Sequence, residues 1–270
     1  MDRIEKLTYQ EYDAIEALNA GKLKSMAISP RHAQVFRERS STPSLRIGSM
    51  AHLAVLEPDV FSSSVAVSKN FDRRYKDQKA LALQFEEENA GKTIIDHDTY
   101  TTICSISEAL AEHPAAHKLL TRCRRREESI IWQDNAGVLC KSRPDMFNEE
   151  LGICCDLKTI KAGDGKPENF LRSALSFERL YHWQAAFYLR GFQKLGLPIH
   201  RWIWIVVETS EPFGVSCVQA SSDMIEYARQ CISPLIEQYA DCAQKGAWPA
   251  YSDKIEEPDT PQWILDKLYG

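Results

Sequence analysis

The chain has 270 residues, of which 44% are hydrophobic, and a formal net charge of −5. At roughly 100–200 residues per domain, this length predicts one large domain or two small ones, and the apolar fraction suffices for a core. No apolar run reaches the roughly 18 residues of a membrane helix, and the charged N-terminus lacks a signal-peptide apolar region, so we expect a cytoplasmic protein without a membrane partner. The acidic charge does not indicate a nucleic-acid binder, but it permits a local basic surface.

Helices are predicted for most of the first 120 residues. Helical spacing covers 9–28, with a break near residue 20, and Ser29-Pro30 starts a helix over 30–39. After a loop at 40–44, helical spacing returns over 46–56. His52 is the single histidine there, and on periodicity alone such a residue is more often part of the core than functional.

Shorter elements and a basic run follow. We predict a strand at 65–67, a helix at 81–89, a strand at 91–98 and a helix through 110 that Asp98 caps. The basic run 122–126 contains Arg122, Arg124, Arg125 and Arg126. Such a run indicates either a solvated face or a contact with DNA phosphates, which requires positive charge but no base readout.

Three strands are predicted in the middle of the chain, over 128–132, 138–147 and 153–159, with turns at 134–137 and 148–152 between them. Pro144 inside the second strand predicts an irregularity near Asp145. In the third strand, Asp156 and Lys158 are two residues apart and therefore share a face. We expect that face to carry polar chemistry and the opposite face to join the core.

The remaining pattern predicts a helix at 169–195, strands at 201–208 and 214–219, and a long helix at 221–245 capped by Ser221 or Ser222. The polar tail 249–270 carries aromatic residues that we expect to act as anchors. The fold class is therefore α/β, with a central mixed sheet flanked by helices and an N-terminal helical region. We predict a single domain over 1–270, with a helical part at 1–120 that carries His52, a core at 121–248 and the tail.

The eight cysteines form no CxxC pair. We expect core thiols in a reducing compartment rather than a metal or iron–sulfur site. Their positions are Cys104, Cys123, Cys140, Cys154, Cys155, Cys217, Cys231 and Cys242.

Asp145, Asp156 and Lys158 come together if the two strands that hold them pair. Two carboxylates can bind Mg²⁺, which prefers oxygen ligands, and the bound ion polarises a phosphate and lowers the pKa of a bound water. Lys158 can orient or deprotonate that water, or offset charge on phosphate oxygens. Taken alone, however, an Asp-x-Lys triplet is more often a solvated strand end.

The order of several motifs resembles a known family. Pro144-Asp145, followed by Asp156-Leu157-Lys158, resembles the PD-(D/E)xK nuclease signature, and Gln184 to Tyr188 is similar to the QxxxY motif of its RecB-like branch. His52 stands where that branch places a histidine. Together with 48–52, 56–58, Arg143 and Thr159, these motifs resemble the RecE (exonuclease VIII) family of nuclease domains, over about 22–248. The resemblance implies a PD-(D/E)xK restriction-endonuclease-like core around the central mixed sheet.

The resemblance implies a Mg²⁺-dependent 5′-to-3′ exonuclease, for which Mn²⁺ can substitute, that degrades linear double-stranded DNA from its ends in a bacterial or phage-infected cell. The 3′ overhangs would serve recombination through a RecT-like annealing partner, and the chain would form a homo-oligomeric ring, with a tetramer favoured. Carried onto this sequence, the metal ligands are His52, Asp145, Asp156 and the backbone carbonyl of Leu157; Lys158 is the catalytic lysine, and Gln184 and Tyr188 contact the cleaved strand or brace the lysine.

Alternatives remain open on the sequence. The chain is little more than the nuclease domain and lacks the long N-terminal extension of RecE. Its length is that of a stand-alone phage-type exonuclease. Other readings are a PD-(D/E)xK endonuclease, a Cas4-like nuclease with an iron–sulfur cluster, or a catalytically inactive DNA-binding module. Glu127 or Glu128 offers a further carboxylate. Candidates for binding a 5′ phosphate are Arg143, Lys161 and the run 122–126.

Overall fold

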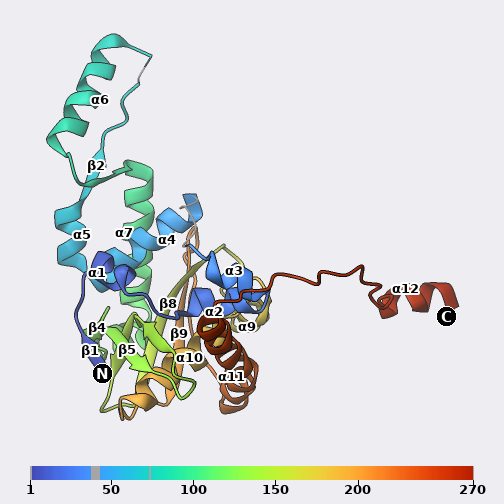
Figure 1. Ribbon diagram of the computed structural model, residues 1–270. Helices are drawn as coiled ribbons and strands as arrows, with labels where there is room; N and C mark the ends of the chain where they lie inside the picture. Colours follow the sequence, from blue (N-terminus) through green and yellow to red (C-terminus); the bar gives the residue numbers. More distant parts are fainter. Residues whose placement is uncertain (1, 38–42, 73, 270) are drawn as a thin grey trace.

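The computed structural model describes residues 2–37, 43–72 and 74–269, with the side chains of 43–45 outside the description. Two sheets, a set of covering helices, a projecting arm and an extended C-terminal tail make up the molecule (Figure 1). The strands are β1 (Arg3–Glu5), β2 (Val65–Ser68), β3 (Thr93–Asp96), β4 (Arg125–Arg126), β5 (Ser129–Gln133), β6 (Leu139–Ser142), β7 (Met146–Asn148), β8 (Ile153–Ile160), β9 (Arg201–Glu208) and β10 (Val215–Gln219). The helices are α1 (Tyr9–Ala14), α2 (Ala20–Met26), α3 (Pro30–Gln34), α4 (Pro43–Leu56), α5 (Pro58–Ser64), α6 (Lys76–Glu88), α7 (His97–Glu112), α8 (Pro114–Arg122), α9 (Pro167–Leu175), α10 (Tyr181–Lys194), α11 (Ser222–Lys245) and α12 (Gln262–Tyr269).

The central sheet has five strands in the order β10-β9-β8-β7-β4, and only its β8–β9 pair is parallel. The parallel pair needs a crossover, which α9 and α10 supply between the two strands. A second sheet, β1-β5-β6, lies beside it. The prediction of a mixed sheet flanked by helices is confirmed.

Each face of the central sheet packs on its own helices. On one face, α10 and α11 enclose an aromatic core that includes Phe187, Trp202 and Trp204, all buried. On the other face, α4, α7 and α8 cover Leu157, Ile205 and other aliphatic side chains. The apolar, β-branched run of β9 matches a strand buried on both faces. Asp156 is only 1% exposed, so the face of β8 that carries Asp156 and Lys158 is polar but largely buried.

The strand predicted over 138–147 is two strands in different sheets. Its first part, β6, pairs with β5, and its second part, β7, pairs with β8. Pro144 stands in the break, and because proline has no N–H it cannot continue a ladder. Asp145 consequently ends no strand: it stands immediately before β7, where the chain passes from one sheet to the other.

Other element boundaries also differ from the prediction. The helix expected over 169–195 is two helices, α9 and α10, because Leu180 has a left-handed backbone with φ 46°. Asp96, rather than Asp98, caps α7 by accepting a hydrogen bond from the Thr99 N–H at 2.7 Å. Ser221 caps α11 as predicted. The helix predicted over 30–39 ends at Gln34, and most of the predicted loop 40–44 lies outside the described residues.

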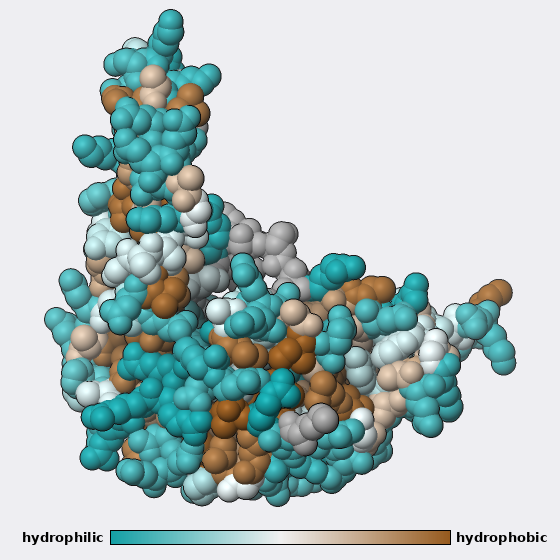
Figure 2. All heavy atoms as spheres, turned by 60° about the vertical axis from the view of Figure 1, so that its left-hand side comes forward, coloured by the Kyte–Doolittle hydropathy of each residue, from teal (hydrophilic) through white to brown (hydrophobic). Residues whose placement is uncertain are grey.

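A projecting arm interrupts the helical half of the chain (Figure 1). It contains α5, α6 and the parallel pair β2–β3, in which Val65 is the register partner of Thr93. A small apolar cluster, including Val65, Ile95 and Ile103, joins the arm to α7. The helix α6 begins at Lys76, five residues before the predicted start. Figure 2 shows the arm as a column with a largely hydrophilic surface.

The C-terminal tail runs away from the body and ends in α12 (Figure 1). Trp248 packs on Tyr239 and Tyr251 lies against His32, so both aromatic residues contact the body. The Trp263 ring contacts Lys267 of its own helix instead. All eight cysteines are free thiols, and five of them are buried, as expected of core thiols. Within the described ranges, no helix combines the length and the apolar character that crossing a membrane requires.

Candidate active site

A cleft of about 650 Å³ opens beside β8. It is lined by residues of α4, of the break between the two sheets, of β8 and of the start of α10, including His52, Arg143, Lys158 and Tyr181. The helix α4 approaches β8 closely, since a Cβ on Gly48 would lie 2.8 Å from the Thr159 hydroxyl oxygen. His52 is one helical turn after Gly48, on the same face of α4, and it therefore points into the cleft.

His52, Glu127 and Asp145 form a group of potential metal ligands. One ligand atom from each of the three lies within 4.8 Å of the others, and the His52 Nδ1 is 3.5 Å from an Asp145 carboxylate oxygen. Two carboxylates and an imidazole suit Mg²⁺ or Mn²⁺. Within the described part of the chain, no other group of His, Cys, Asp or Glu meets the same criterion, so no cysteine cluster supports a Cas4-like site.

Glu127 is held in the site by an unusual backbone. Its φ is 51°, in the left-handed region that a residue with a side chain adopts at a cost of about 1–3 kcal/mol. Its N–H donates to the Asp145 carbonyl at 3.1 Å, and its carboxylate accepts from the Arg143 Nε at 2.7 Å. Glu128 points elsewhere and pairs with Arg125. Of the two glutamates that the sequence left open, Glu127 is the one in the cleft.

The backbone of Leu157 contacts the same group. Its N–H donates to the Asp145 carboxylate at 2.6 Å, which fixes that side chain across the β7–β8 pair. Leu157 lines the cleft together with His52. Burial lowers the pKa of His52, and an interaction of the ring with the Leu157 backbone opposes that shift.

Asp156, Lys158 and Gln184 form a second group. The Lys158 Nζ lies 2.6 Å from one Asp156 carboxylate oxygen, and the Gln184 amide donates to the other at 3.0 Å. The Gln184 carbonyl oxygen is 3.5 Å from the Lys158 Nζ. Gln184 thus braces both residues, as predicted for the lysine. Asp156 is engaged with this group and is not in the group of His52, Glu127 and Asp145.

Burial and crowding of the carboxylates set the electrostatics of the site. Burial, followed by the charge of Asp156, raises the pKa of Asp145 to about 8. Burial, followed by the charge of Asp145, raises the pKa of Glu127 to about 7, although Arg143 opposes this shift. The raised pKa values show that the surrounding protein does not fully compensate the negative charges of the two carboxylates. A bound cation would favour their charged forms.

The bases are tuned in opposite directions. Burial, followed by the charge of Lys158, lowers the pKa of His52, so the ring is a neutral potential ligand and its contact with Asp145 is not an ion pair. For Lys158, burial alone would lower the pKa, but the charge of Asp156 and further contributions raise it. A lysine with a raised pKa stays protonated at neutral pH. Of its two predicted roles, this favours offsetting phosphate charge over deprotonating water.

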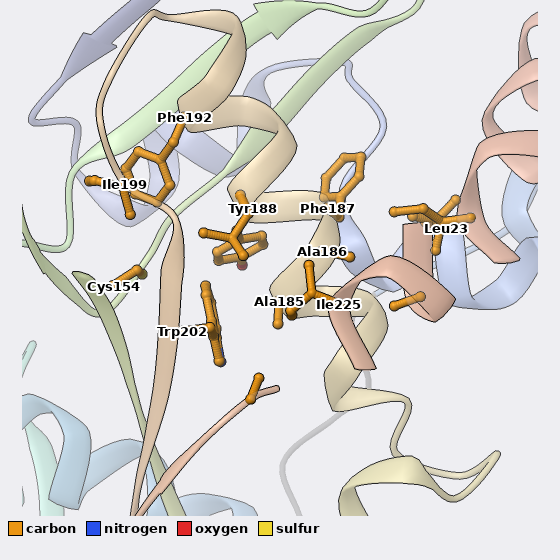
Figure 3. Close-up of a cluster of buried hydrophobic side chains, with 14 of the residues drawn as sticks. Leu23, Cys154, Ala185, Ala186, Phe187, Tyr188, Phe192, Ile199, Trp202 and Ile225 are labelled. Atoms are coloured by element: carbon orange, nitrogen blue, oxygen red, sulfur yellow. The ribbon is translucent and has the colours of Figure 1, made fainter. Parts of the chain in front are cut away.

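Tyr188 lies in the core rather than in the cleft. Figure 3 shows it among the buried side chains between α10 and the strands, facing Trp202, and the two rings are 5.6 Å apart at their centroids. A hydrogen bond from the Arg143 backbone lowers the pKa of its phenol, against the larger effect of burial, which raises it. Among the described residues, Lys158 contacts Asp156, Gln184 and the Tyr181 ring, and Tyr188 is not in contact with it. Its hydroxyl supports the break that holds Pro144 and Asp145.

The basic run divides into structural and exposed residues. Arg125 pairs with Glu128 and Glu149, and Arg126 donates to carbonyls at the ends of α4 and α8. Arg122 and Arg124 are exposed and line a larger cleft of about 870 Å³ beside α8, which contains none of the predicted catalytic residues. Arg143 lies in the active-site cleft itself, and its buried Nη1 has no hydrogen-bond partner. Lys161 is exposed.

Comparisons with known proteins agree with this fold. Residues 20–260 match the family model of the PDDEXK-like domain of unknown function (DUF3799). The crystal structure of a putative exonuclease from Eubacterium rectale is similar, with a TM-score of 0.61 and 13% sequence identity over 98% of each chain. No protein with a curated description matches the sequence. Because the family model spans most of the chain, the protein belongs to this family of PDDEXK-like domains.

Proposed function

We propose that the protein is a Mg²⁺-dependent exonuclease that degrades linear double-stranded DNA from its ends in the 5′-to-3′ direction and leaves 3′ overhangs. Membership of a PDDEXK-like family and the fold shared with a putative exonuclease support a nuclease. The observation that carries the proposal is the cleft in which a potential metal group and a braced lysine lie side by side. The direction of digestion and the preference for ends rest on the RecE-like order of the motifs.

The two groups divide the chemistry. His52, Glu127 and Asp145, with the Leu157 backbone beside them, have the oxygen and nitrogen donors that fit Mg²⁺ or Mn²⁺. A divalent ion bound there would polarise the phosphate and lower the pKa of a water ligand. Asp156 acts on that group electrostatically, since its negative charge raises the pKa of Asp145.

Lys158 offsets negative charge that develops on the phosphate oxygens. Asp156 and Gln184 hold its ammonium in place, so little reorganisation is needed when the charge develops. Arg143 has a buried N–H without a partner at the same cleft and can donate it to a second phosphate oxygen. The intact set of acids and lysine argues against a catalytically inactive DNA-binding module.

End-labelled digestion tests the activity. Linear duplex and closed-circular duplex are incubated with Mg²⁺, with Mn²⁺ and with EDTA, and products are followed from labels at the 5′ and 3′ ends. We expect loss of the 5′ label first, no cutting of the circle and no activity in EDTA. Cutting of the circle would support the endonuclease alternative, and loss of the 3′ label first would overturn the proposed direction.

The assembly and the partner are part of the proposal. We propose a homo-oligomeric ring around DNA, with a tetramer favoured, working in the cytoplasm with a RecT-like annealing protein that receives the 3′ overhang. Light scattering gives the mass of the assembly at working concentrations, and a monomeric mass that persists on a DNA end would contradict the ring.

A further inference from the structure

Three cations surround one aromatic ring at the edge of the active-site cleft. From the centroid of the Tyr181 ring, the Lys158 Nζ is 4.7 Å away, the Lys24 Nζ 5.3 Å and the Arg179 guanidinium carbon 5.7 Å. Only Lys158 has a carboxylate partner, Asp156. Within the described ranges, neither Lys24 nor Arg179 forms an ion pair. Lys24 and Arg179 therefore bring basic groups to this side of the cleft that no carboxylate partner within those ranges neutralises.

Lys24 comes from a distant part of the chain. It lies on α2, and its Nζ donates to the Arg179 carbonyl at 2.6 Å, which uses one of the three N–H groups of the ammonium. Burial, followed by the charge of Lys158, lowers the pKa of Lys24 to about 7. A largely buried ammonium without a carboxylate is costly to a folded protein, and an anionic ligand at this place would remove that cost.

The backbone that presents Arg179 and Tyr181 is strained. Leu180, between them, has φ 46°, and it gives α10 no side-chain cap. A left-handed conformation at a residue with a bulky side chain persists only where the surrounding structure enforces it. Here the strained turn places the Arg179 carbonyl on Lys24 and the Tyr181 ring under Lys158, and it leaves the positive end of the α10 dipole beside them.

We propose that Lys24, Arg179 and the Tyr181 ring form a phosphate subsite beside Lys158, which binds a phosphate of the DNA strand next to the one that is cleaved. The identification of the ligand as DNA rests on the proposed function. The Tyr181 ring positions Lys24 and Arg179 beside Lys158 through cation–π contacts, and Lys24 and Arg179 donate to the phosphate oxygens. Lys24 and Arg179 are positioning residues, since the cleaved bond lies at Lys158.

The test measures binding of a linear duplex in EDTA, where no strand is cut. Lys24→Met keeps the aliphatic stem and removes the charge, and Lys22→Met on the same helix is the matched control, because Lys22 contacts Glu16 instead of Tyr181. Charge-assisted hydrogen bonds contribute enough that we expect Lys24→Met to weaken binding roughly tenfold to a hundredfold. Lys22→Met should stay within about twofold of the unmodified protein, because an exposed ion pair contributes little.

The substrate then identifies the phosphate. Three kinds of duplex are compared. The first has a 5′ phosphate and the second a 5′ hydroxyl. The third is a series in which one neutral methylphosphonate replaces successive internal linkages near the 5′ end. If Lys24 binds a terminal phosphate, the effect of Lys24→Met disappears on the 5′ hydroxyl duplex. If it binds a backbone phosphodiester, the effect disappears at one methylphosphonate position. An effect of equal size on every duplex, or no effect at all, overturns the subsite.

A second variant guards against misfolding. Arg179→Gln leaves the backbone carbonyl that Lys24 uses, and we expect a raised KM, a nearly unchanged kcat and the same substrate dependence as Lys24→Met. A reduced kcat with unchanged KM and unchanged binding overturns the proposal. If the protein cuts no DNA but its DNA binding depends on Lys24, the proposed exonuclease activity is refuted and the phosphate subsite is supported. If the protein cuts DNA but neither variant changes DNA binding, the activity is supported and the subsite is refuted.

Discussion

The two groups of side chains in the active-site cleft differ in whether their charges are balanced within the protein. On one side, His52, Glu127 and Asp145 come from three separate segments. Burial and a nearby carboxylate raise the pKa of both acids: the carboxylate is Asp156 for Asp145, and Asp145 for Glu127. On the other side, Asp156 and Lys158 neutralise each other and share Gln184 as a brace. The first group is incomplete without a cation, while the second is satisfied within the protein. This difference indicates which of the two groups requires a bound cation.

The largest effect on cleavage is expected from a change in the group of Asp156, Lys158 and Gln184. Lys158→Met keeps the stem against Tyr181 and removes the charge, so we expect cleavage of linear duplex to fall by roughly 10²–10⁴-fold, the range for loss of one positioned catalytic group. Digestion rates with saturating Mg²⁺ measure it. Lys166→Met, at an exposed residue outside the cleft that pairs with Glu168, is the control and should cut normally. Near-normal activity of Lys158→Met would mean that the lysine is not part of the catalytic machinery.

Glu127→Gln addresses the incomplete side. It keeps the shape of the side chain and removes a charge from the potential metal group, so we expect the Mg²⁺ concentration for half-maximal activity to rise roughly tenfold to a hundredfold. The neighbouring change Glu128→Gln removes a charge that pairs with Arg125 outside the cleft, and metal dependence should then stay unchanged. Equal effects of the two changes would remove Glu127 from the metal group.

The raised acid pKa values give a pH dependence with a definite sign. Asp145 and Glu127 bind protons in the folded state that they release in the unfolded state, so their contribution to stability is present at low pH and is lost as pH rises through about 7 to 8. A divalent ion should restore it. We therefore expect the increase in unfolding temperature on adding Mg²⁺ to be larger at pH 8.5 than at pH 6, and a flat difference would contradict this account. In Asp145→Asn the difference should shrink at both pH values.

The smallest effect is expected from Tyr188→Phe. It removes the hydroxyl that accepts a hydrogen bond from the Arg143 backbone and leaves the packing on Trp202 intact, so we expect a loss of about 1 kcal/mol in unfolding free energy. Cleavage should fall by no more than a few-fold, because the hydroxyl supports the break before Asp145 and does not touch Lys158. Denaturant unfolding and digestion rates measured on one preparation check both. A complete loss of cleavage would give Tyr188 a direct role.

Sequence reasoning placed the lysine side more fully than the metal side. Asp156 and Lys158 lie on one strand, so local periodicity places them on one face, and the resemblance to the QxxxY motif implies that Gln184 braces the lysine. Glu127 was only one of two possible carboxylates. The signal that selects it is its backbone hydrogen bond to Asp145 and its left-handed φ, neither of which can be read from residue types.

The sheet architecture shows the same limit. The helices, the buried β9 and the flanked mixed sheet follow from apolar patterning. The division of 138–147 between two sheets does not, because β6 is held by β5 and by a bridge from Leu18 to Cys140, which are long-range contacts. Lys24 shows the same limit: it contacts Tyr181 only because α2 packs against α10, which is far away in the chain.

The parallel pairing of β2 and β3 limits how the arm can change. If the two strands were antiparallel, a turn of two residues could connect them in place of α6, and a single deletion could shorten the arm. Since they are parallel, with Ser68 opposite Asp96, the chain must return along the full length of the pair before β3 begins. The helix α6 makes that return, so its surface is open to substitution and lengthening, whereas its removal would also dismantle the strand pair. Variation among relatives is therefore expected in what the arm carries rather than in whether it is there.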